Sequence, residues 1–263
     1  MIHSDIDHGK EFDWGRTSED YAKYRDIYPP EFYEKIISLG LCNKGMSVLD
    51  IATGTGVLPR ALYSTGARFT GTDISAEQIS HAKLLAEKNG MDIDFFCCGG
   101  EEQIFPDNSF DSATACQCHW YFDHEKLSET MFHQLRSGGT LTFLQMNWLP
   151  HEDEIAAQSE KLILKYNPSW TGCDFDRGLI DVPQVYLDRF ELLHSEMFDI
   201  EVPFTRESWN GRIRACRGVG ASLSGEALQS FEKEHISMLE EYPEHFNVLH
   251  NAAIAVLRSK KEN

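Results

Sequence analysis

The order of apolar and polar positions between Met46 and Trp148 predicts short strands that alternate with helices. The predicted strands cover residues 46–52, 68–72, 93–98, 110–118 and 140–147. Strand–helix alternation of this kind builds a parallel sheet with helices on both faces. Sheets of this type bind their ligands at the carboxyl ends of the strands, where the winding reverses.

Turn and capping residues indicate where the intervening helices begin and end. The first predicted helix covers residues 57–64. A second begins after Ser75, with Gln78 three residues later as a capping box, and it ends at Asn89-Gly90. Asp123 caps a third helix that reaches Leu135, and the residues 137–139 (Ser-Gly-Gly) then turn the chain into the fifth strand.

After Trp148 the pattern changes to longer helical segments around two further strands. Helices are predicted at about 152–166, 207–217 and 224–241, and strands at about 197–205 and 247–259. We therefore expect an α/β fold with a doubly wound, seven-stranded, mostly parallel sheet and helical lid insertions, in a single domain over residues 1–263. The core sheet is expected at about 41–150, 191–205 and 246–260, and the lid at 10–40, 151–190 and 206–243.

Net charge narrows the possible partners. The formal charge is −18, from 42 acidic and 24 basic residues, and a field of that sign repels phosphate backbones. Binding nucleic acid would need a local basic patch, and the best candidate for one is the small group of Arg212, Arg214 and Arg217. A nucleic-acid substrate is therefore disfavoured. The N-terminus lacks a secretory signal and no apolar run approaches the ~20 residues of a membrane span. We expect a cytoplasmic protein with no membrane partner.

Metal and disulfide frameworks are also disfavoured. The seven cysteines contain no C-x-x-C pair and are interpreted as reduced core residues. His3, Asp5, Asp7 and His8 could bind a metal, but a flexible acidic terminus accounts for them better, because their spacing is not diagnostic. We expect no metal site.

A glycine-rich turn carries the strongest chemical signal. The segment from Val48 to Leu58 (VLDIATGTGVL) is a strand that enters a turn with Gly54 and Gly56 and then opens a helix. Asp73 follows Asp50 by 23 residues, at the end of the second strand, where a carboxylate binds a ribose diol in nucleotide-binding folds. A dinucleotide-binding dehydrogenase also uses such a turn, but its third glycine is missing here.

Four motifs in order then resemble the class I S-adenosylmethionine (SAM)-dependent methyltransferases, over about residues 46–148. They are the glycine turn, Gly71–Ser75 (GTDIS), Gly100–Asp111 with its P-D-N-S-F-D end, and Leu135–Thr140 (LRSGGT). Gln117–Asp123 (QCHWYFD) and Tyr21–Pro29 further resemble the methyltransferase type 11 group that includes trans-aconitate-type enzymes. Ala52, Gly99, Ser137 and Asp26 depart from the family pattern; Ala52 suits the turn if its dihedrals are ordinary there.

The resemblance implies SAM as the cofactor, with S-adenosylhomocysteine as its product. Asp50, Ala52 and Gly54 would hold the methionine portion of SAM, and Gln117 would face it. Asp73 would bind the ribose hydroxyls, Ile74 would line the adenine, and Gly100 and Glu101 would flank the adenine amine. Tyr24 and Arg25 are candidates for closing over the cofactor and pairing with its carboxylate; the alternative is surface packing of an N-terminal helix.

The acceptor is expected to be a small molecule, such as a carboxylate or another oxygen or nitrogen nucleophile. His119 is a candidate general base or hydrogen-bond partner, or else a structural histidine beside Trp120. Trp120, Tyr121 and Trp209 are candidate substrate residues, and Arg212 could clamp an acidic group unless it lies on a solvated helix face. A non-catalytic SAM-binding protein and a nicotinamide-dependent oxidoreductase are the alternative functions.

Overall fold

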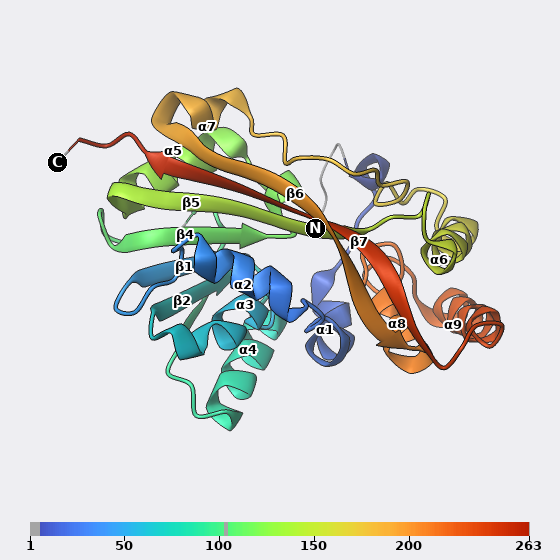
Figure 1. Ribbon diagram of the computed structural model, residues 1–263. Coiled ribbons are helices and arrows are strands. Elements are labelled where there is room, and N and C mark those ends of the chain that lie inside the picture. Colours follow the sequence, from blue (N-terminus) through green and yellow to red (C-terminus); the bar gives the residue numbers. More distant parts are fainter. Residues whose placement is uncertain (1–5, 103–104, 263) are drawn as a thin grey trace. The chain divides into compact units, whose positions relative to one another are not determined.

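The computed structural model describes residues 6–102 and 105–262. They contain a seven-stranded sheet with the strand order β3-β2-β1-β4-β5-β7-β6, and helices lie against it (Figure 1). β1 pairs in parallel with β2 and β4, and β2–β3 and β4–β5 are also parallel. β7 runs opposite to its edge neighbour β6 (Figure 1). The predicted fold class is confirmed.

The elements follow the predicted order. The strands are β1 Ser47–Ile51, β2 Arg68–Asp73, β3 Asp94–Cys97, β4 Phe110–Cys116, β5 Leu135–Trp148, β6 Phe190–Thr205 and β7 His245–Ser259. The α-helices are α1 Ser18–Tyr24, α2 Pro30–Ser38, α3 Val57–Ala61, α4 Ala76–Lys88, α5 His124–Gln134, α6 Glu154–Tyr166, α7 Gln184–Arg189, α8 Arg206–Arg214 and α9 Gly225–Leu239. The 3-10 helices in the described residues are η1 Asp7–Gly9, η2 Trp14–Thr17, η3 Tyr63–Thr65 and η4 His119–Tyr121.

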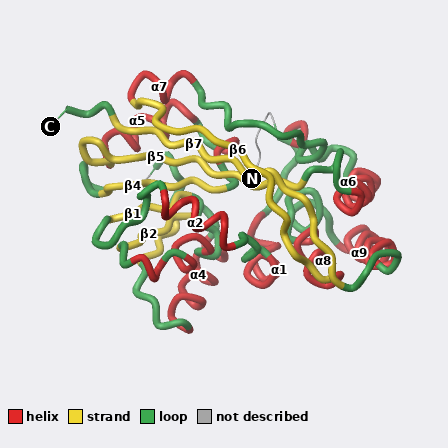
Figure 2. The backbone as a smooth tube through the Cα atoms, in the orientation of Figure 1, coloured by secondary structure: helices red, strands yellow, loops and turns green. Residues whose placement is uncertain are grey.

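The chain divides into two compact units, and each is described by itself. The sheet unit comprises Tyr28–Met146, Gly178–Phe198 and Ala252–Asn263, and the helical unit comprises Met1–Ile27, Asn147–Arg177 and Asp199–Asn251. The long strands β5, β6 and β7 pass from one unit into the other (Figure 2). Of the segments expected as a lid, 206–243 belongs wholly to the helical unit, whereas 10–40 and 151–190 contribute to both.

The core of the sheet unit lies on both faces of its strands. Leu49 and Ile51 of β1 pack on one face with residues of α5 and α7. Asp50 pairs with Gly71, and Gly71 with Phe95, so these three side-chain positions share the opposite face. Phe95 packs there against α4. This alternation fixes which residues the strand ends present to a ligand.

Local signals located most helix ends correctly. The Ser75 hydroxyl accepts a hydrogen bond from the Gln78 amide at 3.3 Å, and Asp123 caps α5 in the same way through Lys126 at 3.2 Å. Three predictions were wrong in extent. The strand expected at about 197–205 begins at Phe190, as β6. The first helix ends at Ala61, and β5 begins at Leu135 because the predicted turn lies inside an irregular strand register.

Asp7 is anchored within the helical unit, contrary to the prediction that it belongs to a flexible terminus. His3 and Asp5 lie outside the described residues. Asp7 is buried; its carboxylate lies 2.9 Å from Arg217 Nε and accepts the Thr171 amide at 2.8 Å. Asp7 is therefore held as a buried ion pair. In the described parts of the chain, no helix is both long and apolar enough to cross a bilayer.

Candidate functional site

Eight predicted cofactor residues lie in the sheet unit, at or just beyond the carboxyl ends of neighbouring strands. Parallel strands end at one edge of a sheet, so residues that follow them come together. The strands β1, β2 and β4 supply most of this set, and the segment after β3 supplies the rest. The eight residues are Asp50, Ala52, Gly54, Asp73, Ile74, Gly100, Glu101 and Gln117.

The turn after β1 adopts the left-handed backbone conformation at alternate residues. The φ angles are 53° at Ala52, 57° at Gly54 and 75° at Gly56. Glycine adopts this region without cost, whereas a residue with a Cβ is strained by about 1–2 kcal/mol. The condition set for Ala52, an ordinary dihedral, is therefore not met. Strain of this kind is typical of backbone shaped around a ligand.

Asp50 orders this turn through its neighbours. Its carboxylate is buried and accepts hydrogen bonds from the hydroxyls of Thr53 at 2.6 Å and Thr114 at 2.7 Å. Both carboxylate oxygens are thus engaged inside the protein, and a direct contact with SAM stays a prediction. Burial raises the pKa of Asp50 from 3.8 to about 6, and the two hydroxyls oppose that rise.

Asp50 makes folding stability depend on pH. The pKa of Asp50 is higher in the folded protein than in the unfolded chain. Its contribution to the free energy of unfolding is therefore fully present below about pH 4 and is lost as the pH rises through about 6. We expect Asp50→Asn to raise the free energy of unfolding by about 1–3 kcal/mol at pH 7.5 and by much less at pH 4.5. Urea unfolding at both pH values measures this difference. An equal change at both would show that the carboxylate is not the cause.

Asp73 ends β2 with its carboxylate fixed by two backbone amides. Gly54 N donates to one oxygen and Ser75 N to the other, each at 2.9 Å. Burial raises the pKa of Asp73, and these two amides lower it. The next side chain, Ile74, is 62% exposed. A carboxylate in this setting keeps lone pairs available for a diol, beside an apolar surface suited to a flat ring.

Gly100 and Glu101 are placed by contacts to α5 and its flanking residues. A Cβ on Gly100 would stand 2.8 Å from the Phe122 ring and 2.9 Å from Ile51, so the position admits no side chain. The Glu101 carboxylate accepts a hydrogen bond from the Asp123 amide at 2.8 Å. The backbone carbonyl of Glu101 accepts one from the Thr130 hydroxyl at 3.0 Å. The backbone here is therefore held in a fixed place at the strand ends.

Gln117 follows β4 in a strained conformation with φ 59°. Its side-chain amide donates to the Met146 carbonyl, and its own backbone amide donates to the Leu144 carbonyl at 2.8 Å. Its side-chain oxygen is buried and has no hydrogen-bond partner within residues 6–102 and 105–262. A buried acceptor in this state fits a ligand that brings a donor, such as an ammonium group.

His119 and Trp120 form an aromatic group after Gln117. The imidazole lies 4.7 Å from the Trp120 ring centroid and 6.0 Å from Phe143, and Trp120 lies 5.7 Å from Tyr121. Burial is the main cause that lowers the pKa of His119 from 6.5 to about 4, so this ring is neutral at physiological pH. His119, Trp120 and Tyr121 are only partly buried, which leaves each with surface for a ligand.

The geometry at the strand ends agrees with the protein family that the sequence matches. Residues 48–139 match a family model described as a methyltransferase domain. Residues 48–139 therefore form a methyltransferase domain. The predicted resemblance is confirmed, and the oxidoreductase alternative has no support from these matches.

The relatives of this methyltransferase domain match only part of the chain. It is 41% identical over 93 residues to a ubiquinone biosynthesis O-methyltransferase of Bradyrhizobium sp. (strain ORS 278), which covers 35% of this chain and 36% of that protein. It is 31% identical over 114 residues to a demethylmenaquinone methyltransferase of Thermus thermophilus, covering 42% and 52%. The chain thus spans about half or less of these curated relatives.

A solved structure shows the fold over a longer stretch. A phosphoethanolamine N-methyltransferase 2 of Haemonchus contortus, in complex with S-adenosylhomocysteine, aligns with a TM-score of 0.57 at 18% identity. The alignment covers 93% of this chain and 58% of that one. The likeness therefore extends beyond the methyltransferase domain, as far as fold is concerned.

Tyr24 and Arg25 belong to the helical unit, apart from the eight residues above. The Tyr24 ring fills the space beside Gly211 of α8, where a Cβ would stand 2.2 Å from it, and its hydroxyl donates to Glu207 at 2.8 Å. Arg25 lies over the Tyr21 ring at 4.7 Å. These contacts show α1 packed on α8, which was the alternative interpretation for Tyr24. Cofactor contacts of both residues stay predictions.

Trp209 is a core residue of the helical unit. Its fully buried ring packs edge-on against Trp148 at 5.6 Å and Phe204 at 4.8 Å, and its indole N–H donates to Ser159 at 2.9 Å. A substrate could reach it only if this packing opened. The substrate role suggested for Trp209 therefore has no support from the structure.

Arg212 is buried, so the alternative interpretation that it lies on a solvated helix face is wrong. Its guanidinium lies 4.9 Å from the Trp148 ring centroid, a cation–π contact. Burial lowers the pKa of His250 and raises that of the Cys216 thiol. The charges of Arg212 and Arg25 add to the first shift and oppose the second. The positive charge of both guanidinium groups is thus felt at the same pair of side chains.

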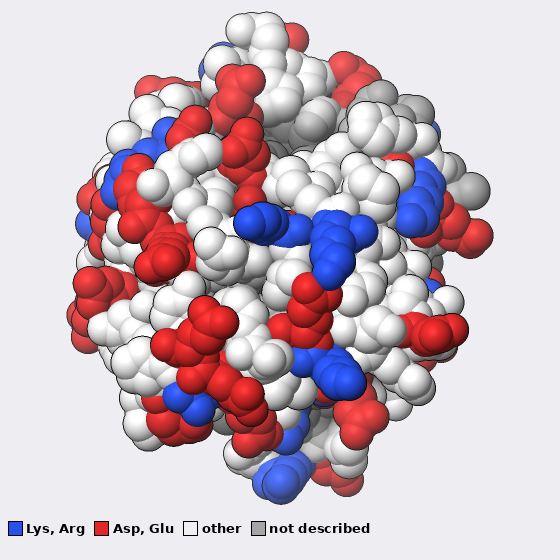
Figure 3. Space-filling model, turned by 90° about the vertical axis from the view of Figure 1, so that its right-hand side faces the viewer, with Lys and Arg blue, Asp and Glu red and all other residues white. Residues whose placement is uncertain are grey.

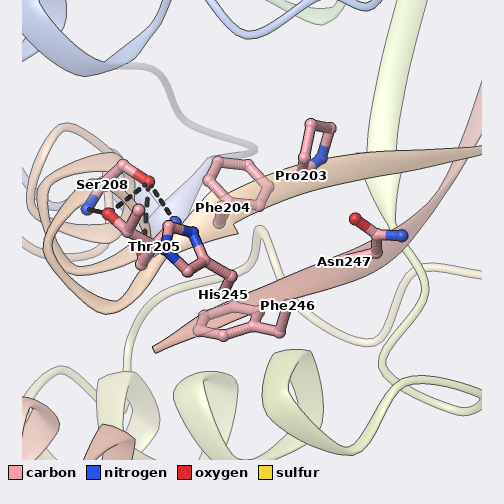
Figure 4. Close-up of a pocket in the computed structure, with 7 residues that line it drawn as sticks. All are labelled: Pro203, Phe204, Thr205, Ser208, His245, Phe246 and Asn247. Carbon is pink, nitrogen blue, oxygen red and sulfur yellow. Dashed lines mark hydrogen bonds between the residues drawn. The ribbon is translucent and has the colours of Figure 1, made fainter. Parts of the chain in front are cut away.

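Two surface pockets lie in the helical unit, and Tyr24 is the predicted site residue among the residues that line them. One, of about 400 Å³, lies where β6 and β7 meet the start of α8 and is lined by Pro203, Phe204, Thr205, Ser208, His245, Phe246 and Asn247 (Figure 4). Thr205 and Ser208 hydrogen-bond to each other there, so this helix start is already capped. The other, of about 450 Å³, is bordered by Tyr24 and Asn210.

The two hydroxyls that hold Asp50 were not predicted from the sequence. Thr53 lies three residues after Asp50, a spacing at which a hydroxyl can reach the carboxylate, so it could have been found. Thr114 is 64 residues away and reaches Asp50 only because β1 and β4 are neighbours. No local signal marks it.

Proposed function

We propose that this chain is a SAM-dependent methyltransferase that methylates an oxygen or nitrogen nucleophile of a small molecule, a carboxylate among the candidates. The observation that carries the proposal is the Asp73 carboxylate, fixed by the amides of Gly54 and Ser75 beside a left-handed glycine turn. A ribose diol and a nearby backbone approach are what this arrangement suits.

The residues present fit SAM. When bound, SAM supplies an electrophilic methyl group on a sulfonium. Asp73 would hold the ribose hydroxyls, and the exposed Ile74 would cover the adenine. Gly100 lets its backbone, which would flank the adenine, pack closely against Phe122 and Ile51. The buried Gln117 oxygen would accept a donor from the methionine end. Asp50 acts one step away, by ordering the turn through Thr53 and Thr114.

The protein's task in methyl transfer is alignment of the reacting atoms and exclusion of water. Because its pKa is about 4, His119 is a weak base at neutral pH, yet it can accept a hydrogen bond from an acceptor hydroxyl or amine. Trp120 and Tyr121 would flank the acceptor. An acceptor that is already ionised, such as a carboxylate, needs no base at all.

We expect His119 to stay neutral between pH 5.5 and 8. The NMR titration of its imidazole, identified by loss of the signal in His119→Gln, should show an inflection below about pH 5. A midpoint near 6.5 would contradict the neutral state and would restore His119 as a general base.

An acidic group on the acceptor is supported by charge in the helical unit. Arg212 and Arg25 both act on His250 and Cys216, as their effects on these two pKa values show. Arginine is the preferred partner of a carboxylate because its planar fork matches two oxygens. We keep Arg25 as the proposed partner of the SAM carboxylate and Arg212 as that of an acidic acceptor. Because Arg212 is buried against Trp148, the second role requires the packing around Trp148 to open when the acceptor binds.

A nucleic-acid substrate is disfavoured by the environments of the three arginines in the predicted basic group. Arg212 is buried, Arg214 is paired with Asp20 and Glu232, and Arg217 is paired with buried Asp7. The predicted basic group therefore presents no separate basic patch. Acidic side chains are interspersed with the basic ones on the face in Figure 3, and the net charge is −18.

Calorimetric titration of the full chain with SAM, S-adenosylhomocysteine and NAD tests the proposal. Binding of the first two without NAD supports a SAM enzyme, and binding of NAD alone would overturn it. Transfer of label from methyl-labelled SAM to acidic and aromatic small molecules then separates an enzyme from a SAM-binding protein. SAM binding without transfer to any acceptor class would favour the non-catalytic alternative.

A further inference from the structure

Strand β6 forms one edge of the sheet. The strand order places β7 on one side of β6, and in the described part of the chain no strand lies on the other (Figures 1 and 2). The outer edge of such a strand carries backbone N–H and C=O groups in register for another strand, and proteins usually shorten or charge such edges. β6 is not shortened, since it is 16 residues long, and its charged residues Glu191 and Glu196 are paired with Arg258 and Lys35.

The part of β6 within the sheet unit is also apolar at its surface. Leu192, Leu193 and Met197 are 42%, 45% and 44% exposed, and Leu179 in the segment before the strand is exposed too. These four belong to nine exposed large apolar side chains among the described residues. Three of them lie within six residues of one edge strand, which indicates an interaction surface rather than scattered exposure.

The sequence of this edge is matched to itself in the antiparallel direction. Read outward from Ser195, His194 corresponds to Glu196 on the other side, and Leu193 corresponds to Met197. We propose that two copies of this chain form a dimer by antiparallel pairing of β6 through residues 193–197, about a two-fold axis at Ser195. The pairing is isologous, so each contact occurs twice.

The two faces of the paired strands would each be complementary. Leu193, Ser195 and Met197 share one face by the two-residue period, so Leu193 packs on the partner's Met197 there. On the other face, His194 Nε2 already lies 2.9 Å from Glu196, and Lys35 Nζ lies 2.9 Å from the same carboxylate. Pairing sets His194 opposite the partner's Glu196 and extends this charged network.

A second copy fits this edge better than an unrelated peptide. An unrelated strand would need apolar and acidic positions in this same mirrored order, whereas a second copy supplies them by symmetry. The end residue Glu191 is already paired with Arg258 at 2.6 Å, which reduces like-charge repulsion along the strand. The net charge of −18 opposes association at long range, so added salt should favour the dimer.

Sedimentation equilibrium of the full chain tests the dimer. We expect a concentration-dependent monomer–dimer equilibrium, with Leu193→Glu raising the dimer Kd at least about tenfold. Leu84→Glu is the matched control, because Leu84 is an exposed leucine on α4, and it should leave the Kd unchanged. A wild-type monomer at several hundred micromolar, or an equal effect of both variants, would overturn the proposal.

Cysteine cross-linking tests the register. Residues directly opposite in an antiparallel pair have Cβ atoms about 4.5–5.5 Å apart, close to what a disulfide bridges. Ser195→Cys should therefore form a covalent dimer on mild oxidation. Leu192→Cys in the same strand should not, because its symmetry mate is six residues away along the strands. Wild type gives the background from the native cysteines, of which Cys97 is exposed. Equal cross-linking of both variants would contradict this register.

Discussion

Asp73→Ala should weaken SAM binding by about 100-fold or more. The variant removes a carboxylate that is expected to accept two ribose hydroxyls, and hydrogen bonds to a charged group contribute about 1.5–3 kcal/mol each. It also removes the acceptor for the Gly54 amide at 2.9 Å, so the glycine turn loses a support. Calorimetry with SAM and S-adenosylhomocysteine measures both losses together.

The matched control is Asp94→Ala, because Asp94 is an exposed carboxylate at the start of the adjacent strand β3. It changes the net charge equally and should leave SAM affinity within about twofold. Circular dichroism should show that both variants are folded. Near-normal SAM affinity in folded Asp73→Ala would remove the ribose assignment, and with it the observation on which the proposed function rests.

Gly54→Val should abolish measurable SAM binding. Gly54 has φ 57°, a region that β-branched residues rarely adopt, so the substitution strains the turn by about 1–3 kcal/mol. The added side chain would also stand where the backbone is expected to approach the methionine portion. Calorimetry reports the binding, and urea unfolding reports the stability.

Thr55→Val places the same side chain one residue later and serves as the control. Thr55 is fully buried, and its hydroxyl has no hydrogen-bond partner among the described residues. Valine has the same shape, so stability should stay equal or rise by about 1 kcal/mol. If Gly54→Val does not fold, Gly54→Asn tests the same point, since asparagine tolerates this conformation. SAM binding by folded Gly54→Val would count against the turn as the cofactor site.

Most of the sheet unit could be predicted because its signals are local. Apolar runs fix the strands, Ser75 and Asp123 fix helix starts, and glycines fix the tight turn after β1. Each of these depends on residues within a few positions of one another. The errors arose where local signals were weak, as at residues 137–139, which are absorbed into an irregular strand rather than closing a turn.

The environments of the charged residues could not be predicted in the same way. Arg212 carries the same sequence signal whether it lies on a wet surface or under Trp148, and only packing of α8 decides this. Asp7 and Arg217 are 210 residues apart and meet through the arrangement of the helical unit. Trp209 was expected at a substrate surface and is instead a core residue for the same reason.

The sequence by itself determined the class of fold, the glycine turn and the carboxylates at the ends of the first two strands, because periodicity and turn chemistry act over short distances. Only the tertiary structure decided which atoms those groups contact. Asp50 meets Thr114 across two strands, His119 becomes neutral by burial, and β6 is left at the sheet edge. Hydrogen-bond partners, desolvation and edge position all depend on segments far apart in the chain, which are brought together only by packing.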